Sequence, residues 1–135
     1  MRITHGWPNA SRPNAITIGN FDGVHLGHQA MLARLTAQAT ALDAAPTVLT
    51  FEPHPREIFT PTSAPTRLTS LREKLEILQG LGVEHVHICR FTRGFAALGA
   101  EDFVQRILVD GLMARYVLVG DDFRFGAKRA GDLGL

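Results

Sequence analysis

Residues 15–42 read AITIGNFDGVHLGHQAMLARLTAQATAL, and the predicted fold is built around them. Its first four residues are apolar or β-branched and predict a strand over Ala15–Ile18. A turn punctuated by glycines follows over Gly19–His28, and an amphipathic helix follows the turn. The large apolar residues of that helix recur at helical spacing with an alanine in the same stripe: Met31, Leu32, Leu35, Ala39 and Leu42.

A glycine-rich turn between a strand and a helix is a typical place for a phosphate group. The first N–H groups of a helix have no intrahelical partner, and the helix dipole makes this end partly positive. Gly19, Gly23 and Gly27 recur at every fourth residue and allow the backbone to approach a ligand closely. The turn therefore predicts an anion-binding site.

Two histidines distinguish this turn from other phosphate loops. His25 and His28 are three residues apart near the helix start, so their side chains can converge on one face. Gly27 lies between them and has no side chain to obstruct a ligand. The chain has neither a G-x-x-x-x-G-K-[ST] loop nor a G-x-G-x-x-G fingerprint. The alternative is a tight turn that carries two solvated histidines.

Composition limits the other classes of function. The chain has 135 residues, a length that suits one domain. Its 14 basic and 13 acidic residues nearly balance, which gives no electrostatic support for nucleic-acid binding. No apolar run is long enough to span a membrane, and residues 1–14 lack the apolar segment of a signal peptide. Cys89 is the single cysteine and lies in an apolar run, which favours a buried, inert thiol. We expect a soluble, cytoplasmic protein.

Strands and helices are expected to alternate along the chain. Further apolar runs predict strands over Thr47–Phe51, His85–Phe91 and Tyr116–Val119, with helices from Ser70 and from Glu101 between them, while residues 1–14 give no clear element. Near-continuous apolar strands are typical of a parallel sheet with helices on both faces. The fold class is therefore α/β with a mostly parallel sheet.

Unusual segments follow three of these strands. They are Gly19–His28, Phe51–Pro55 and Gly120–Gly126. Right-handed crossovers place the carboxyl ends of parallel strands along one edge of the sheet, where ligands bind. The three segments are therefore expected to form one shared site.

The order and content of these segments resemble known enzymes. Gly19, Phe21, Asp22, His25, Gly27 and His28 resemble the G-x-F-D-x-x-H-x-G-H signature of nucleotidyltransferases. Together with Thr50–Pro55 and Gly120–Gly126, they resemble the N-terminal adenylyltransferase domain of bacterial FAD synthetases, bifunctional enzymes that also carry a riboflavin kinase domain. The resemblance covers nearly the whole chain. It implies a Rossmann-like nucleotidyltransferase fold and the reaction of FMN with ATP–Mg²⁺ to give FAD and pyrophosphate.

The resemblance also implies roles for individual residues. His25 and His28 would be catalytic and would contact the ATP phosphates. The segments near Pro53–Pro55 and Asp122–Gly126 would face the flavin. The expected ATP-binding set is Gly19, Asn20, Phe21, Asp22, His25, Gly27 and His28, and the expected FMN-binding set is Pro53, His54, Pro55, Asp122, Phe123, Phe125 and Gly126.

The chemistry limits what the histidines need to do. The second pKa of a phosphomonoester such as FMN is about 6, so its phosphate needs no general base at neutral pH. We therefore expect His25 and His28 to donate hydrogen bonds to ATP or to act as cations toward it. Mg²⁺ would be held mostly by phosphates and water, and no protein metal ligand is assigned, although Asp22 is a possible one.

Other clusters are weaker candidates. His85 and His87 alternate along a strand and could form a metal pair, but no third ligand is evident, so partly buried strand histidines are the better interpretation. Arg124, Lys128 and Arg129 form a short basic cluster that is expected to be a solvated loop.

The resemblance stops short of the family's later segments. A Ser-Ser-Thr-x-x-Arg type element and the riboflavin kinase domain of the full-length relatives do not occur in these 135 residues. We therefore expect an incomplete adenylyltransferase pocket and weak ligand binding at best. The expected partners are FMN and ATP, with no nucleic acid and no membrane. Two alternatives stay open: another nucleotidyltransferase with the same first motif, and a non-catalytic flavin- or nucleotide-binding module.

Overall fold

The computed structural model describes residues 1–19, 21, 26–52, 71–90 and 97–119. Several of the residues expected at the site lie outside this part of the chain, namely Asn20, Asp22, His25, Pro53–Pro55 and Asp122–Gly126. The basic cluster after residue 123 also lies outside it. The described elements, in chain order, are β1 (Arg2–His5), β2 (Asn14–Ile18), α1 (Leu26–Ala41), β3 (Ala45–Glu52), α3 (Leu71–Gly80), β4 (His85–Arg90), α5 (Ala100–Asp102), the π-helix η2 (Phe103–Gly111) and β5 (Ala114–Leu118).

The five described strands form one parallel sheet in the order β1-β4-β3-β2-β5. This confirms the predicted α/β class. From β2 the chain moves to β3 and β4 on one side, and it then returns to place β5 on the other side of β2. The order therefore reverses next to β2, and in open α/β sheets a ligand binds outside the carboxyl ends of the strands at such a point.

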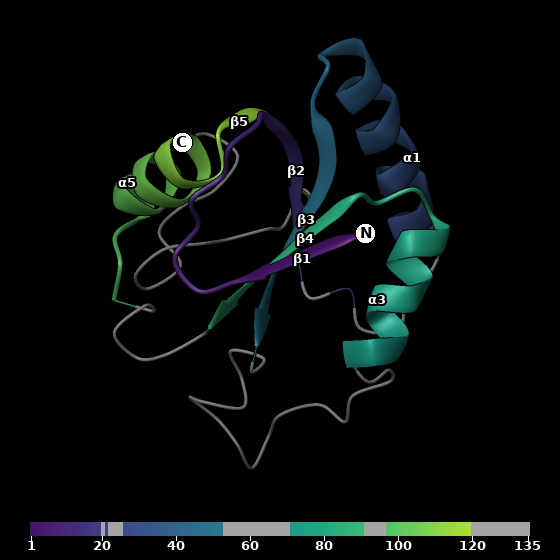
Figure 1. The fold of residues 1–135 in the computed structure, drawn as a ribbon, viewed down its shortest axis with the longest axis horizontal. Helices are drawn as coiled ribbons and strands as arrows, with labels where there is room; N and C mark the ends of the chain where they lie inside the picture. The colour runs from purple at the N-terminus through teal and green to yellow at the C-terminus, as the bar shows by residue number, and fades with distance from the viewer. Residues whose placement is uncertain (20, 22–25, 53–70, 91–96, 120–135) are drawn as a thin grey trace.

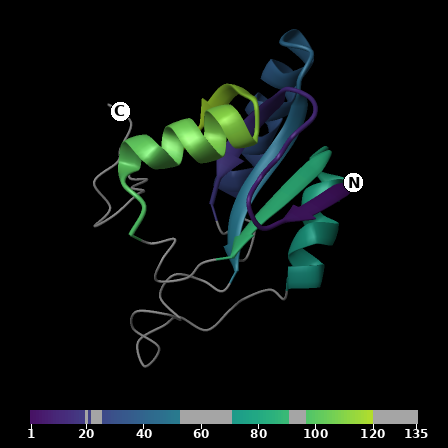
Figure 2. The same cartoon turned by 60° about the vertical axis from the view of Figure 1, so that its left-hand side comes forward.

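Helices cover both faces of the sheet (Figures 1 and 2). α1 and α3 lie on one face, and the helix formed by α5 and η2 lies on the other. Successive residues of β2 serve the two faces in turn, because Ala15 packs in the core under α1 and Ile16 packs in the core under η2. Every residue of β2 is buried. This explains why three of its five residues are apolar and none is charged.

The turns after the first two long helices each contain a residue with a positive φ. Gly82 has φ +95° just beyond α3, the left-handed conformation that a glycine commonly adopts at a helix end. The N–H of Val83 then donates to the carbonyl of Leu78. After α1, Asp43 adopts a positive φ of 51° and the N–H of Ala44 donates to the carbonyl of Ala39. Each turn leads directly into the next strand.

Two features differ from the sequence-based expectation. Residues 1–14 gave no clear element, yet Arg2–His5 forms an edge strand that pairs with β4. The helix from residue 100 is α-helical for only three residues and continues as a π-helix. At its end a Cβ on Gly111 would lie only 2.5 Å from Cγ of Pro8, so the N-terminal segment packs directly on this turn.

Candidate active site

The turn after β2 is anchored to the neighbouring strand. The N–H of Gly19 donates to the carbonyl of Leu49 at 3.0 Å and so extends the contact of β2 with β3 by one residue. A Cβ on Gly19 would lie 3.0 Å from Cε2 of Phe21. A side chain at Gly19 would therefore crowd the Phe21 ring, which would have to shift by a few tenths of an ångström.

Phe21 turns its side chain into the protein. Its φ of +54° lies in the left-handed region, which is uncommon for a residue other than glycine. The side chain is only 4 % exposed and belongs to the core cluster under α1, with Ala15, Leu32 and Val48 among its members. Phe21 is thus a core residue that lies at the carboxyl end of β2, and any contact with ATP stays a prediction.

His28 lies in the first turn of α1 and is half-buried. Its ring centroid is 4.9 Å from that of Phe21, with the ring planes tilted by 57°. The backbone of Gly27 is helical at the same turn. The structure therefore brings Gly19, Phe21, Gly27 and His28 together where β2 ends and α1 begins. The convergence of His28 with His25 stays a prediction, because His25 lies outside the described residues.

The predicted flavin segments adjoin strands that flank β2. The chain enters Pro53–Pro55 directly from the carboxyl end of β3, and it reaches Asp122–Gly126 shortly after β5 ends at Leu118. β3 and β5 are the two hydrogen-bonded neighbours of β2. The three segments thus follow three adjacent parallel strands, which supports a shared site. The contacts within these segments stay predictions.

His85 and His87 lie elsewhere, between β4 and β1. Both are buried, and both rings contact the same hydroxyl: Thr4 Oγ1 is 2.7 Å from His85 Nε2 and 2.7 Å from His87 Nδ1. His87 Nε2 donates to the Gly6 carbonyl at 2.8 Å, and His85 Nδ1 lies 3.4 Å from Asn14 Oδ1. These rings are therefore internal structural groups, which confirms the interpretation as buried strand histidines.

Electrostatics agrees with that interpretation. Burial, assisted by the nearby Arg2 guanidinium, lowers the pKa of His85 from 6.5 to about 4. Burial also lowers the pKa of His87, against the opposing effect of its bond to the Gly6 carbonyl. Within the described residues, no three histidine, cysteine or carboxylate side chains are grouped as a metal site would require. Burial also raises the pKa of the Cys89 thiol to about 12, so this cysteine is inert as expected.

One buried cation near the carboxyl edge was not singled out by the sequence. Lys74 is 4 % exposed and donates from Nζ to Thr50 Oγ1 at 3.3 Å, near the end of β3. The available signal was its position, because Lys74 falls on the same helical stripe as Leu71, Leu75 and Leu78. A charged residue on an apolar stripe indicates a side chain that is directed inward.

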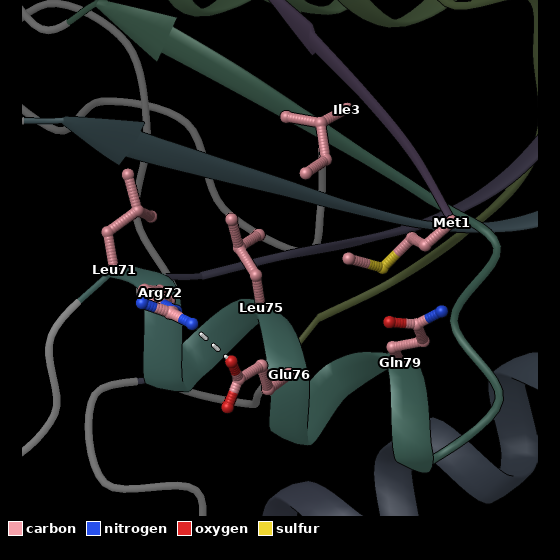
Figure 3. A pocket seen from close by; sticks show the side chains of 7 residues that line it. All are labelled: Met1, Ile3, Leu71, Arg72, Leu75, Glu76 and Gln79. Carbon is pink, nitrogen blue, oxygen red and sulfur yellow. Dashed lines mark hydrogen bonds and ion pairs between the residues drawn. The ribbon is translucent and has the colours of Figure 1, made fainter.

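A shallow hollow lies between β1 and α3 (Figure 3). It contains none of the residues expected at the site. Its polar side includes the exposed ion pair of Arg72 with Glu76, whose atoms are 3.3 Å apart. The lining residues are Met1, Ile3, Leu71, Arg72, Leu75, Glu76 and Gln79.

Known proteins with similar sequences share one description. The chain is 46 % identical over 136 residues to a bifunctional riboflavin kinase/FMN adenylyltransferase of Escherichia coli strain K12, covering 98 % of this chain and 44 % of the relative. It is 52 % identical to the Pseudomonas fluorescens enzyme of the same name, covering 98 % of this chain and 42 % of the relative. The chain thus spans less than half the length of the curated relatives that it matches.

A solved structure has the same fold. A chain described as a macrolide-efflux protein from Streptococcus pneumoniae superposes with a TM-score of 0.79 at 25 % sequence identity, covering 93 % of this chain and 44 % of the other. In the part of the chain that the structure describes, no helix is both long and apolar enough to cross a membrane. The family model for FAD synthetase matches residues 8–135, and the chain therefore belongs to the FAD synthetase family.

Proposed function

We propose that residues 1–135 provide the FMN adenylyltransferase domain of a longer bifunctional enzyme. The domain would transfer AMP from ATP to FMN, giving FAD and pyrophosphate. Family membership and the names of the relatives support this reaction. The structural observation that carries it is the turn from β2 into α1, which holds His28 in the first turn of α1 at the point where the strand order reverses.

The proposed reaction needs positioning more than acid–base chemistry. A phosphate oxygen of FMN attacks the α-phosphorus of ATP, and the bond from that phosphorus to the pyrophosphate oxygen breaks. Negative charge then develops on the departing pyrophosphate. His28, with His25 as its proposed partner, and the backbone N–H groups in the first turn of α1 would stabilise that charge. Gly27 leaves room for the phosphates because it carries no side chain.

We propose that Mg²⁺ binds as part of the ATP–Mg²⁺ substrate. The described groups at the turn are an imidazole and backbone N–H donors, and these suit an anion rather than a hard cation. The Mg²⁺ of ATP–Mg²⁺ would therefore keep phosphate and water ligands. Pro53–Pro55 and Asp122–Gly126 would face the flavin, and the strands that precede them, β3 and β5, both pair with β2. A location in the cytoplasm, where ATP and FMN are available, fits this activity.

The test separates chemistry from flavin binding. We expect His28→Ala to lower FAD formation by roughly 10²–10³-fold, the usual effect of removing one charge-stabilising donor, while the Kd for FMN stays unchanged. FAD formation is measured by chromatography with fluorescence detection, and FMN binding is measured by fluorescence quenching. His5→Ala is the matched control, because His5 is an exposed histidine on β1. An equal loss of FMN binding and turnover would contradict the role of His28.

A binding module is distinguished by the same measurements. If the chain binds FMN and ATP–Mg²⁺ but forms no FAD, also within the longer enzyme, it is a non-catalytic module. If the longer enzyme consumes another phosphate substrate in place of FMN, the chain is a different nucleotidyltransferase. FMN-dependent release of pyrophosphate by the longer enzyme supports the proposal over both alternatives.

A further inference from the structure

Phe21 and His28 contact each other across the start of α1. Their ring centroids are 4.9 Å apart and their planes are tilted by 57°, an arrangement within the favourable range for aromatic pairs. Phe21 comes from the turn after β2, whereas His28 comes from the helix. The contact therefore connects the two elements that meet at the proposed nucleotide site.

The position of the Phe21 ring is restricted on several sides. The side chain is 4 % exposed and packs in the core under α1. Its φ of +54° turns the side chain inward, at the cost of an unfavourable backbone conformation. The ring edge also occupies the space beside Gly19, where a Cβ would be only 3.0 Å from Cε2. A ring held in this way is a rigid surface for whatever lies against it.

Burial restricts the motion of the His28 side chain less than that of the Phe21 side chain. It is half-buried, whereas Phe21 is almost completely enclosed. Contact between two aromatic rings shifts a side-chain equilibrium by about two- to tenfold. Contact with Phe21 therefore has a direct effect on how often the imidazole occupies one orientation.

We propose that Phe21 is a positioning residue for His28: its buried ring fixes the imidazole at the start of α1 and acts on the nucleotide only through that imidazole. This inference rests on the proposed function for its catalytic consequence. It changes the role expected for Phe21 from an ATP contact to a support behind one. It also assigns Gly19 a second task, which is to leave room for the supporting ring.

The spectroscopic test uses the 135-residue chain without any ligand. The proton resonances of the His28 ring are identified by their loss in His28→Gln. Nuclear Overhauser contacts between the rings of Phe21 and His28 are expected in the wild type. Phe21→Leu should remove the ring-current shift from the His28 signals, whereas Phe21→Tyr should retain it. Ile88→Val is the control, because Ile88 belongs to the same core cluster but lies on β4, with β3 between it and β2.

The binding test uses ATP–Mg²⁺ and inorganic pyrophosphate as probes. We expect Phe21→Leu to weaken binding of ATP–Mg²⁺ about two- to tenfold, and Ile88→Val to leave it unchanged. In a His28→Gln background, Phe21→Leu should cause no further loss, because the two residues act as a unit. A further loss of the same size there would show that Phe21 acts independently, and the proposal would be wrong.

Failure of this inference can be told apart from failure of the proposed function. Unchanged His28 signals in folded Phe21→Leu, or absent ring-to-ring contacts in the wild type, would overturn the positioning role while ATP–Mg²⁺ still bound. If Phe21→Leu does not fold, the wild-type ring contacts decide the outcome. If neither ATP–Mg²⁺ nor pyrophosphate perturbs His28 in the wild type, the proposed function fails instead, even where the ring contact is observed.

Discussion

The buried histidines on β4 predict a specific loss of stability in mild acid. Four contacts form a chain from the Gly6 carbonyl through His87, Thr4 and His85 to Asn14 Oδ1. Both terminal groups in this series of contacts accept hydrogen bonds. The Gly6 carbonyl can only accept, and Asn14 presents its Oδ1 because its amide nitrogen donates to the Leu112 carbonyl at 2.7 Å. Two neutral imidazoles and one hydroxyl supply three protons for four contacts.

The number of protons shows which of the four contacts lacks a hydrogen bond. His87 Nε2 must donate to the Gly6 carbonyl, so its neutral Nδ1 accepts from the Thr4 hydroxyl. His85 Nε2 then donates to Thr4 Oγ1, which leaves His85 Nδ1 as an acceptor facing Asn14 Oδ1. This contact is the longest of the four at 3.4 Å. A fourth proton on His85 Nδ1 would complete the chain, but burial opposes it, as do the nearby charges of Arg2 and Arg12 and the His87 ring.

The magnitude follows from proton linkage. The pKa of His85 is about 4 in the folded chain and 6.5 in an unfolded one. As the pH falls, the unfolded state therefore binds the proton first. The stabilisation is complete above pH 6.5 and is lost progressively toward pH 4, at about 1.4 kcal/mol per pH unit. Between pH 7 and pH 5 the loss from His85 is about 2 kcal/mol, and the lowered pKa of His87 adds to it in the same direction.

The assay compares the pH dependence of each variant with its own value at pH 7. Urea unfolding followed by circular dichroism gives the free energy of unfolding at pH 7 and pH 5. We expect His85→Gln, whose side chain does not titrate, to lose about 2 kcal/mol less than the wild type over this interval. Gln38→Ala, an exposed change on α1 that leaves every titratable group in place, should behave like the wild type. Equal pH dependence in the wild type and His85→Gln would show that the His85 imidazole does not cause the loss of stability.

Three further predictions concern packing and chemistry. Thr4→Val leaves the two histidine nitrogens without their shared hydroxyl and should lower the free energy of unfolding in urea by about 2 kcal/mol. Thr4→Ser keeps a hydroxyl and should lower it much less. Equal losses would show that the hydroxyl does not stabilise the fold. Gly111→Ala places a Cβ 2.5 Å from Pro8 Cγ and should lower the free energy of unfolding by about 1–3 kcal/mol, and adding Pro8→Ala should restore part of it; no restoration would mean that the clash lies elsewhere. Cys89 should react with Ellman's reagent only in urea, because the folded thiol is buried and its pKa is about 12; rapid labelling of the folded chain would contradict its burial.

The sequence predicted the interior of the sheet better than its edge. β2 and the first five residues of β4 are buried, so their apolar runs identify them directly. β1 was missed because Arg2 and Ile3 are exposed and its signal is correspondingly weak. What makes it a strand is pairing with β4, more than eighty residues away, and the contact of Thr4 with two histidines. Such partners cannot be read from the local sequence.

The π-helix was equally hidden from a local pattern. Phe103, Ile107 and Leu108 have the spacing of an ordinary amphipathic helix, and they are buried as that spacing predicts. At the last residue of this helix, the Ala10 N–H donates to the Gly111 carbonyl at 2.7 Å and Pro8 packs beside it. The burial was predictable from residue types, whereas nothing in the residue pattern separates a π-helix from an α-helix here.

The two kinds of histidine in this chain show how environment decides chemistry. His85 and His87 are enclosed between strands and already bonded to one hydroxyl, so they have little capacity to take up charge near neutral pH. His28 is half-buried in the first turn of α1, at the helix end that the dipole makes partly positive. Only the second environment suits a group that meets an anion arriving from solvent. Exchange of the two roles would require the buried pair to lose its hydroxyl and gain access to water. The stability test on His85 and the nucleotide test on His28 therefore examine independent parts of the molecule.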